Sequence, residues 1–224
     1  MRTLSQVALG SALALAIAAG AATGGRASAE TFVDAPQPRV TAPATGKIET
    51  AIFAGGCFWG VEGVFDHVKG VLSATSGYAG GKTGSVSYEA VSTGTTGHAE
   101  AVRIVFDPAK VSYAELLRVY FSVVVDPTTL NYQGPDHGTQ YRTALFPQSA
   151  RQERIARAYL QQLTQSRTFP RPIVTSIEHS NTYYPAEQYH QNFMAKNPTY
   201  PYIVINDRPK VDALKSMFPR LYRS

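Results

Sequence analysis

Apolar residues in the first part of the chain recur with two different periods. From residue 57 to residue 67 they follow helical spacing, which predicts a helix. Three other segments are short apolar or alternating runs bounded by turn residues, and each predicts a strand. These segments are residues 49–54, 71–78 and 98–106. Gly55 and Gly56 separate the first strand from the helix, so we expect Cys57 at a strand-to-helix turn.

The second part of the chain predicts further helices and strands. Ser112 and Glu115 have the spacing of a capping box and precede a helical stripe that Pro127 ends. Ser149 is expected to cap another helix. We also predict strands over residues 140–146 and 173–179, a polar loop over residues 126–139, a short helix from Pro185 to Met194 and a closing helix over residues 207–217. Strands and helices interleave without strict βαβ repetition, which favours an α+β two-layer sandwich with a mixed β-sheet.

The N-terminus has the features of an export signal. Arg2 precedes an apolar stretch, and the small residues at positions 27–29 form an A-x-A cleavage pattern. We therefore expect residues 1–29 to be a signal peptide, residues 30–47 a Pro-rich lead-in and residues 48–224 one folded domain. The apolar stretch is shorter than the ~20 residues of a membrane span. We expect a periplasmic or secreted protein without stable membrane insertion after cleavage.

Composition narrows the class of protein. Hydrophobic residues make up 44% of the 224 residues and charged residues 17%, as in a globular domain. The formal net charge of +5 falls to +3 if Arg2 and Arg26 leave with the signal, because 19 basic residues then face 16 acidic ones. This excess does not argue for nucleic acid as a partner. A single cysteine excludes an intramolecular disulfide, and it disfavours a metal site because no paired thiolates exist.

Cys57 is the strongest candidate for chemistry. Two glycines before it permit a tight turn, and the start of a helix offers unpaired N–H groups and the positive end of a dipole. Such a setting lowers the pKa of a thiol, so we predict a reactive thiolate. Phe58 and Trp59 follow directly, and beside a nucleophile they can form an apolar wall for a small group such as a methyl. Phe58 is equally compatible with a place in the core.

Four motifs resemble the active-site regions of A-type peptide methionine sulfoxide reductases. They are GGCFWG at residues 55–60, GYAGG at 77–81, TGHAEA at 96–101 and DHGTQY at 136–141. The resemblance runs from about residue 48 to residue 200. It implies a ferredoxin-like core and a catalytic domain over residues 48–224. It also implies thiol-dependent reduction of methionine S-sulfoxide in oxidised proteins, and it leaves open whether the free amino acid is a substrate as well.

The resemblance further implies roles for individual residues. Cys57 is then the nucleophile that becomes a sulfenic acid, and Glu100 is the acid that protonates the sulfoxide oxygen. The implied partners of that oxygen and of the substrate pocket are the hydroxyls of Tyr88 and Tyr141 and the side chains of Phe58, Trp59 and Asp136. The alternation of residues 98–106 independently places Glu100 on the apolar side of its strand. Burial there raises the pKa of a carboxyl group and keeps its proton available.

The lone cysteine distinguishes this chain from many relatives, which carry further cysteines that attack the sulfenic acid. We therefore expect an external thiol to regenerate Cys57, supplied by a thioredoxin-like or glutaredoxin-like protein or by a small thiol. We expect oxidised proteins carrying methionine sulfoxide as substrates, no bound cofactor or metal, and a monomer.

Two other classes of function stay open from the sequence. In a thiol hydrolase or acyltransferase, His98 or His137 would serve as the base for Cys57. Both histidines are otherwise expected to be structural, and a buried acid at Glu100 has no clear use in that chemistry. A ligand-binding module without turnover is the third class.

Overall fold

The computed structural model describes residues 32–43, 46–82, 86–180 and 182–224. The predicted signal peptide lies outside these residues. The described chain contains a six-stranded sheet in the order β7-β6-β1-β3-β2-β8 and a small β4-β5 hairpin. The strands of the large sheet are β1 Glu49–Ala54, β2 Val71–Ala79, β3 Ala99–Phe106, β6 Ala144–Phe146, β7 Ser176–Ile177 and β8 Tyr183–Pro185. The hairpin consists of β4 Tyr132–Gln133 and β5 Asp136–His137.

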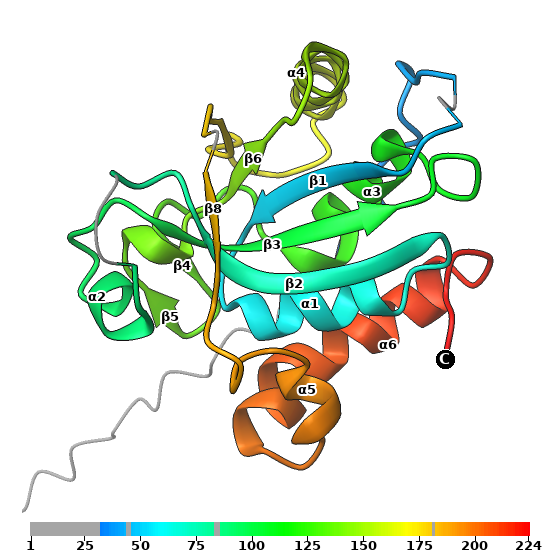
Figure 1. The fold of residues 1–224 in the computed structure, drawn as a ribbon. Coiled ribbons are helices and arrows are strands. Elements are labelled where there is room, and N and C mark those ends of the chain that lie inside the picture. The colour runs from blue at the N-terminus through cyan, green and yellow to red at the C-terminus, as the bar shows by residue number, and fades with distance from the viewer. Residues whose placement is uncertain (1–31, 44–45, 83–85, 181) are drawn as a thin grey trace, which may run out of the picture.

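Six α-helices accompany the strands in the described part of the chain (Figure 1). They are α1 Phe58–Asp66, α2 Tyr88–Ser92, α3 Tyr113–Val119, α4 Ala150–Gln165, α5 Phe193–Lys196 and α6 Arg208–Met217. Helix α3 continues as a π-helical turn over Tyr120–Val124, and a second π-helical turn over Ile203–Asp207 precedes α6. The predicted capping box of Ser112 and Glu115 is confirmed, and so is the Ser149 cap of α4.

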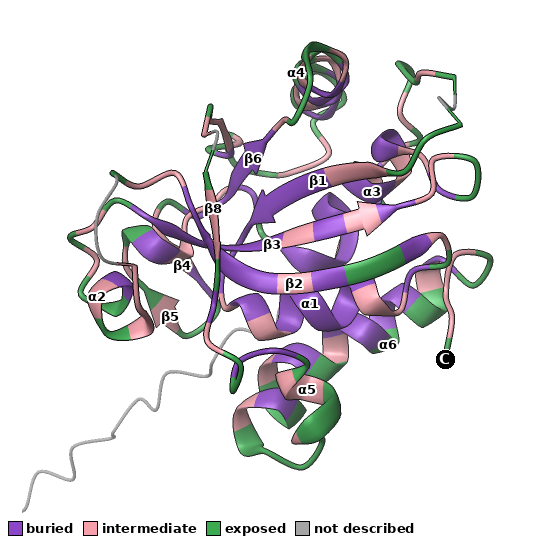
Figure 2. Ribbon diagram, in the orientation of Figure 1, coloured by how far each residue is buried: buried purple, intermediate pink, exposed green. Residues whose placement is uncertain are grey.

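The sheet and helices form two layers around one large core. Neighbouring strands are antiparallel except for β6 and β7, which are parallel, so the sheet is mixed. Alternate residues of β3 face opposite sides of the sheet. Val102, Ile104 and Phe106 lie in the large core with apolar residues of α1, α3, α4 and α6. Ala99 and Ala101 lie on the opposite face, in a smaller cluster. Figure 2 shows the central strands buried along most of their length. The predicted α+β fold with a mixed sheet is confirmed.

Four predicted elements differ from the structure. The strand expected over residues 140–146 is only Ala144–Phe146, because a 3-10 turn occupies Thr139–Tyr141 after Gly138. The strand over residues 173–179 shortens to Ser176–Ile177. The loop over residues 126–139 contains the β4-β5 hairpin.

The prediction for Pro185 is wrong, because this residue ends edge strand β8 and pairs with Gly77 of β2. A proline tolerates an edge position because it need not donate to the sheet. The helix expected from Pro185 to Met194 is reduced to α5, Phe193–Lys196.

The Pro-rich lead-in forms no helix or strand over its described residues, 32–43 and 46–47, and it packs against helices. Val33 N donates to Ser122 O at 3.1 Å, and the Tyr159 hydroxyl donates to Pro36 O at 2.8 Å. Arg118 Nη2 lies 2.9 Å from Asp34 Oδ1. These contacts attach the lead-in to α3, its π-helical turn and α4. Within the described ranges, no helix combines the length and apolar character that crossing a membrane requires.

Candidate active site

Cys57 lies at the turn between β1 and α1, where it is the residue that precedes the helix. Gly56 has φ of +79°, and a Cβ there would lie 2.7 Å from the Cβ of Gln133, so the turn requires glycine. The Tyr120 hydroxyl donates to Ala54 O at 2.6 Å and holds the end of β1. The predicted strand-to-helix turn is therefore present, and it leaves Cys57 partly exposed.

Glu100 lies beside the same turn. The backbone N–H of Phe58 donates to Glu100 Oε2 at 3.0 Å, so the first residue of α1 orients the carboxyl group. Glu100 is 3% exposed. Burial is the main cause that raises its pKa from 4.5 to about 8, and the charges of Asp136 and Asp207 add to the shift while the Phe58 N–H opposes it. At neutral pH the carboxyl group is mostly protonated and can act as an acid, as its strand position predicted.

The pKa of Cys57 differs from the sequence-based expectation. Desolvation of the thiol raises it well above the usual value although the residue as a whole is partly exposed, and the negative charges of Glu100 and Asp207 raise it further. A hydrogen bond from the Trp59 N–H to the sulfur acts in the opposite direction. The prediction of a lowered pKa is therefore wrong for the protein in this structure, because desolvation and two acidic neighbours outweigh the helix start.

Tyr88, Tyr141 and Asp136 approach this pair from three separate elements: α2, the 3-10 turn and β5. Burial raises the pKa of each, and the charge of Glu100 further raises those of both tyrosines. Cys57 also acts electrostatically on both tyrosine hydroxyls. The structure thus brings together the residues for which the family resemblance implied a shared role.

Phe58 and Trp59 occupy different environments. Phe58 is 1% exposed and packs against Tyr78 and His190, so it forms part of the core beneath the site. Trp59 is partly exposed and stacks on Phe193 with ring centroids 3.8 Å apart. An apolar wall next to Cys57 is therefore present, with Trp59 as its accessible part.

The motif region matches the family described as peptide methionine sulfoxide reductase over residues 49–221. The chain belongs to this family. It is 61% identical over 174 residues to peptide methionine sulfoxide reductase MsrA 2 of Mesorhizobium japonicum, covering 78% of this chain and 89% of that protein. It is 50% identical over 170 residues to MsrA of Deinococcus radiodurans, covering 76% and 82%.

Solved structures agree with this membership. The reduced form of Mxr1 from Saccharomyces cerevisiae superposes with a TM-score of 0.61 at 33% identity, covering 72% of this chain and 92% of that one. Methionine sulfoxide reductase A of Corynebacterium diphtheriae gives 0.59 at 34% identity, covering 74% and 84%. The activity of this reductase is the thiol-dependent reduction of methionine sulfoxide, as a peptide-methionine (S)-S-oxide reductase.

The hydrolase alternative is disfavoured by the histidines as well as by the family. His98 is buried against Gly81 and the Tyr184 ring, and His137 is exposed and stacks on Tyr132. The groups that act on the Cys57 thiol are carboxyl groups and a backbone N–H. Each histidine thus packs against groups other than Cys57. Among the residues that the structure describes, no group of three His, Cys, Asp or Glu side chains could hold a metal ion.

Sequence motifs do not point to three residues at the site of this reductase, His190, Tyr202 and Asp207. Trp59 Nε1 donates to His190 Nδ1 at 3.1 Å, which orients the indole and requires an unprotonated Nδ1. The Tyr202 hydroxyl donates to Asp136 Oδ2, and Tyr202 packs edge-on against Trp59. Asp207 acts electrostatically on both Cys57 and Glu100.

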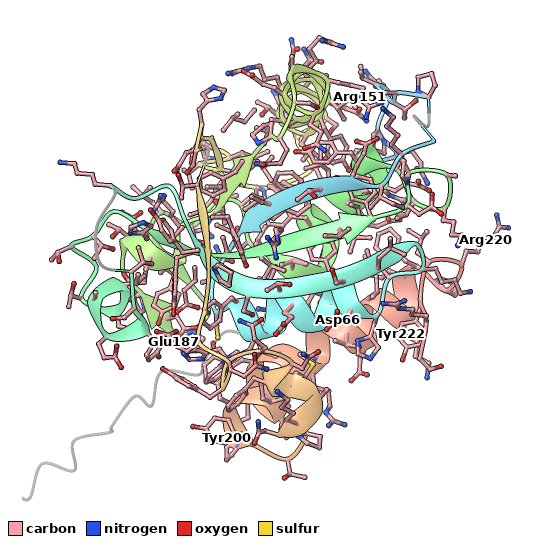
Figure 3. All side chains as sticks on the ribbon, in the orientation of Figure 1. Asp66, Arg151, Glu187, Tyr200, Arg220 and Tyr222 are labelled. Carbon is pink, nitrogen blue, oxygen red and sulfur yellow. The ribbon has the colours of Figure 1, made fainter. Side chains whose placement is uncertain are left out.

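One signal in the sequence could have pointed to this region. The stretch from residue 183 to residue 202 contains six Tyr or Phe residues. Several of them surround Trp59: Phe193 stacks on it, and Tyr200 and Tyr202 pack edge-on against it. Figure 3 shows Tyr200 and Glu187 toward the same end of the molecule, away from Arg220. Glu187 accepts from Tyr88 N at 2.8 Å and from the Tyr78 hydroxyl at 2.9 Å, so it helps to position α2.

Proposed function

We propose that Cys57 takes the oxygen of methionine S-sulfoxide while Glu100 supplies the proton that makes the sulfoxide electrophilic. The observation that carries this proposal is the contact between the Glu100 carboxyl group and the Phe58 N–H, one residue after Cys57. It holds an acid with a pKa of about 8 at the turn that carries the thiol. Tyr88 and Tyr141 donate hydrogen bonds to the same oxygen, and Phe58, Trp59 and Asp136 shape the pocket.

Glu100 protonates the sulfoxide oxygen, and the positive charge that develops on the substrate sulfur stabilises a thiolate at Cys57. Glu100, now a carboxylate, accepts the thiol proton, which reconciles a resting thiol with nucleophilic attack. The net reaction converts a thiol and a sulfoxide into a sulfenic acid and a thioether. Two electrons leave the Cys57 sulfur, and the oxygen ends on it.

Regeneration is proposed to use an external reductant, since Cys57 is the sole cysteine of the chain. One thiol attacks the sulfenic acid, releases water and forms a mixed disulfide, and a second thiol displaces Cys57 and leaves a disulfide. A thioredoxin-like or glutaredoxin-like protein or a small thiol fits this chemistry. The partial exposure of Cys57 supports access by such a partner.

The place of action is also a proposal. The apolar stretch and the A-x-A pattern of residues 1–29 support export, so the substrates would be oxidised proteins of the periplasm or the exterior. Mass spectrometry of the mature protein from its host tests this proposal. A chain that begins near residue 30 supports it, and an intact Met1 on an intracellular protein contradicts it.

The catalytic proposal is tested with the separate S and R epimers of a blocked methionine sulfoxide and dithiothreitol as reductant. We expect turnover of the S epimer, complete loss with Cys57→Ser and an oxygen added to Cys57 in a single turnover without reductant, seen by intact mass. Asp212→Asn serves as the control, because Asp212 is exposed on α6. Turnover of the R epimer alone, or retained turnover in Cys57→Ser, contradicts the proposal. Multiple turnovers without any added thiol contradict the external reductant.

A further inference from the structure

A buried ion pair lies at the start of α6. Asp207 ends the π-helical turn Ile203–Asp207, and Lys210 lies three residues later. Lys210 Nζ is 3.8 Å from Asp207 Oδ1, and the two residues are 3% and 0% exposed. Burial of two charges costs free energy that mutual attraction only partly offsets. A pair of this kind therefore calls for an explanation beyond fold stability.

Its position points to the active site. A Cβ at Gly60 would lie 2.2 Å from Asp207 Oδ1, so the carboxylate approaches the backbone of the first turn of α1. Gly60 is three residues after Cys57, on the helix whose first N–H binds Glu100. The N-terminus of a helix has unpaired N–H groups and therefore favours a nearby negative charge. Asp207 supplies this charge at the N-terminus of α1. The C-terminal segment thus places a charge beside the turn that carries the nucleophile.

Asp207 belongs to a larger set of charged and titratable groups around Cys57, and Lys210 is its ion-pair partner. The others are Glu100 of β3, Asp136 of β5, Tyr88 of α2, Tyr141 of the 3-10 turn and Tyr202. Lys210 also lowers the pKa of Asp136, so its ammonium group acts on two carboxyl groups of this set.

We propose that Asp207 and Lys210 are positioning residues that set where protons reside on Cys57 and Glu100. Asp207 favours the protonated form of both groups before substrate binds, and Lys210 limits that effect by neutralising part of the negative charge. In the reaction, the same carboxylate faces the positive charge that develops as the sulfoxide is protonated. This inference rests on the proposed roles of Cys57 and Glu100.

The electrostatics of the site agree with the geometry. The negative charge of Asp207 raises the pKa of Cys57 and that of Glu100. A thiol kept protonated at rest resists unproductive oxidation, because the thiolate is the form that oxidants attack. A carboxyl group kept protonated is ready to donate to the sulfoxide.

The test is a titration of Cys57, which needs no turnover. As the sole cysteine, Cys57 can be followed by its rate of alkylation with iodoacetamide and by thiolate absorbance as the pH rises. We expect Asp207→Asn to lower the midpoint by about one pH unit, because a like charge is removed. Lys210→Met should raise it, because the charge of Asp207 is then uncompensated. Lys210→Arg should restore the wild-type midpoint, and exposed Asp212→Asn should leave it unchanged.

Asp207→Asn and Lys210→Met are expected to shift the titration midpoint of Cys57 in opposite directions. An unchanged midpoint in folded Asp207→Asn, or shifts of the same sign in Asp207→Asn and Lys210→Met, would overturn it. Circular dichroism establishes that each variant is folded, and if Asp207→Asn does not fold, the Lys210→Met and Lys210→Arg pair decides. Failure of the proposed function would look different. Turnover would then be retained in Cys57→Ser, while the titration midpoints of Cys57 in the Asp207 and Lys210 variants would not be affected by that result.

Discussion

Glu62 and Glu100 are two buried carboxyl groups at the interface between α1 and the sheet, and only one of them lies beside the cysteine. Glu62 is 1% exposed and Glu100 is 3% exposed. Burial is the main cause that raises the pKa of Glu62 to about 7 and that of Glu100 to about 8. By burial and pKa alone, the two groups are nearly equivalent.

Their hydrogen-bond partners distinguish them. Glu62 Oε2 accepts from the Ser76 hydroxyl at 3.1 Å and from Asn192 N at 3.0 Å, so it joins α1, β2 and the segment before α5. Glu100 Oε2 accepts from Phe58 N, next to Cys57. A raised pKa therefore identifies a desolvated acid, and only its neighbours decide whether that acid takes part in chemistry.

Glu100→Gln tests this distinction most strongly. Loss of the general acid should lower kcat/KM by about 10²- to 10⁴-fold, because glutamine cannot protonate the sulfoxide oxygen. Steady-state assays with the S epimer measure the effect. In the wild type, kcat/KM should decline as the pH rises through about 8, where Glu100 loses its proton. If Glu100→Gln kept kcat/KM within twofold of the wild type, Glu100 would have a structural role like that of Glu62 and no role as an acid.

The double variant Tyr88→Phe, Tyr141→Phe addresses the hydroxyls that assist Glu100. Removing both donors should lower kcat by about 10²-fold, with each single change costing less. The measurement is kcat for each single and double variant at one pH below 8. The exposed Tyr189→Phe is the matched control, since its hydroxyl belongs to a side chain that is 57% exposed. Equal losses in the control would argue against a specific role for the two hydroxyls.

Tyr202→Phe should have a smaller effect. It removes the hydrogen bond to Asp136 while keeping the ring against Trp59. A hydrogen bond to a charged group is worth about 1.5–3 kcal/mol. We expect a loss at the lower end of this range, a roughly tenfold fall in kcat/KM, because the bond is made to Asp136 and not to the substrate. Tyr200→Phe provides the comparison, because Tyr200 also packs edge-on against Trp59 and is 47% exposed. Wild-type kinetics in Tyr202→Phe would show that this bond is dispensable.

Glu62→Gln should leave kcat/KM within about twofold of the wild type, because Glu62 bonds to Ser76 and Asn192 and not to the turn that carries Cys57. Its effect should appear in stability. With a folded pKa of about 7 against 4.5, the folded protein binds more protons than the unfolded chain in that range. The free energy of unfolding therefore falls as the pH rises from 4.5 to 7, by on the order of 2–3 kcal/mol from this group.

Urea unfolding at pH 5 and pH 8 measures the contribution of Glu62. Glu62→Gln should reduce the difference between the two pH values, because glutamine does not titrate. An unchanged difference would mean that other groups account for the pH dependence. A large loss of activity in a folded variant would remove the contrast with Glu100.

Much of the site could be predicted from the sequence because its signals are local. Gly55, Gly56 and Cys57 encode a turn, and the alternation around Glu100 assigns that residue to the buried face of its strand. Tyr88, Tyr141 and Asp136 were placed by their resemblance to family motifs, and the structure brings them to Cys57. The capping box of Ser112 and Glu115 could also be predicted, since it depends on two residues three positions apart.

The errors concern features that depend on distant partners. Pro185 has the sequence signature of a helix start, and pairing with β2 makes it the end of an edge strand instead. His190 and Tyr202 carry no motif that could be read alone. His190 bonds to Trp59, which lies more than 130 residues earlier in the chain, and Tyr202 bonds to Asp136. Only the folded chain brings these partners together.

The sequence by itself determined the reacting groups: one thiol at a glycine turn, one acid on the apolar side of a strand, and no second cysteine to regenerate the first. The tertiary structure decided how protons are distributed between them. It surrounded Cys57 with Glu100, Asp136 and Asp207 and raised a pKa that the helix start alone would lower. Desolvation and charge act through space, so their balance was settled only when the C-terminal segment packed against α1.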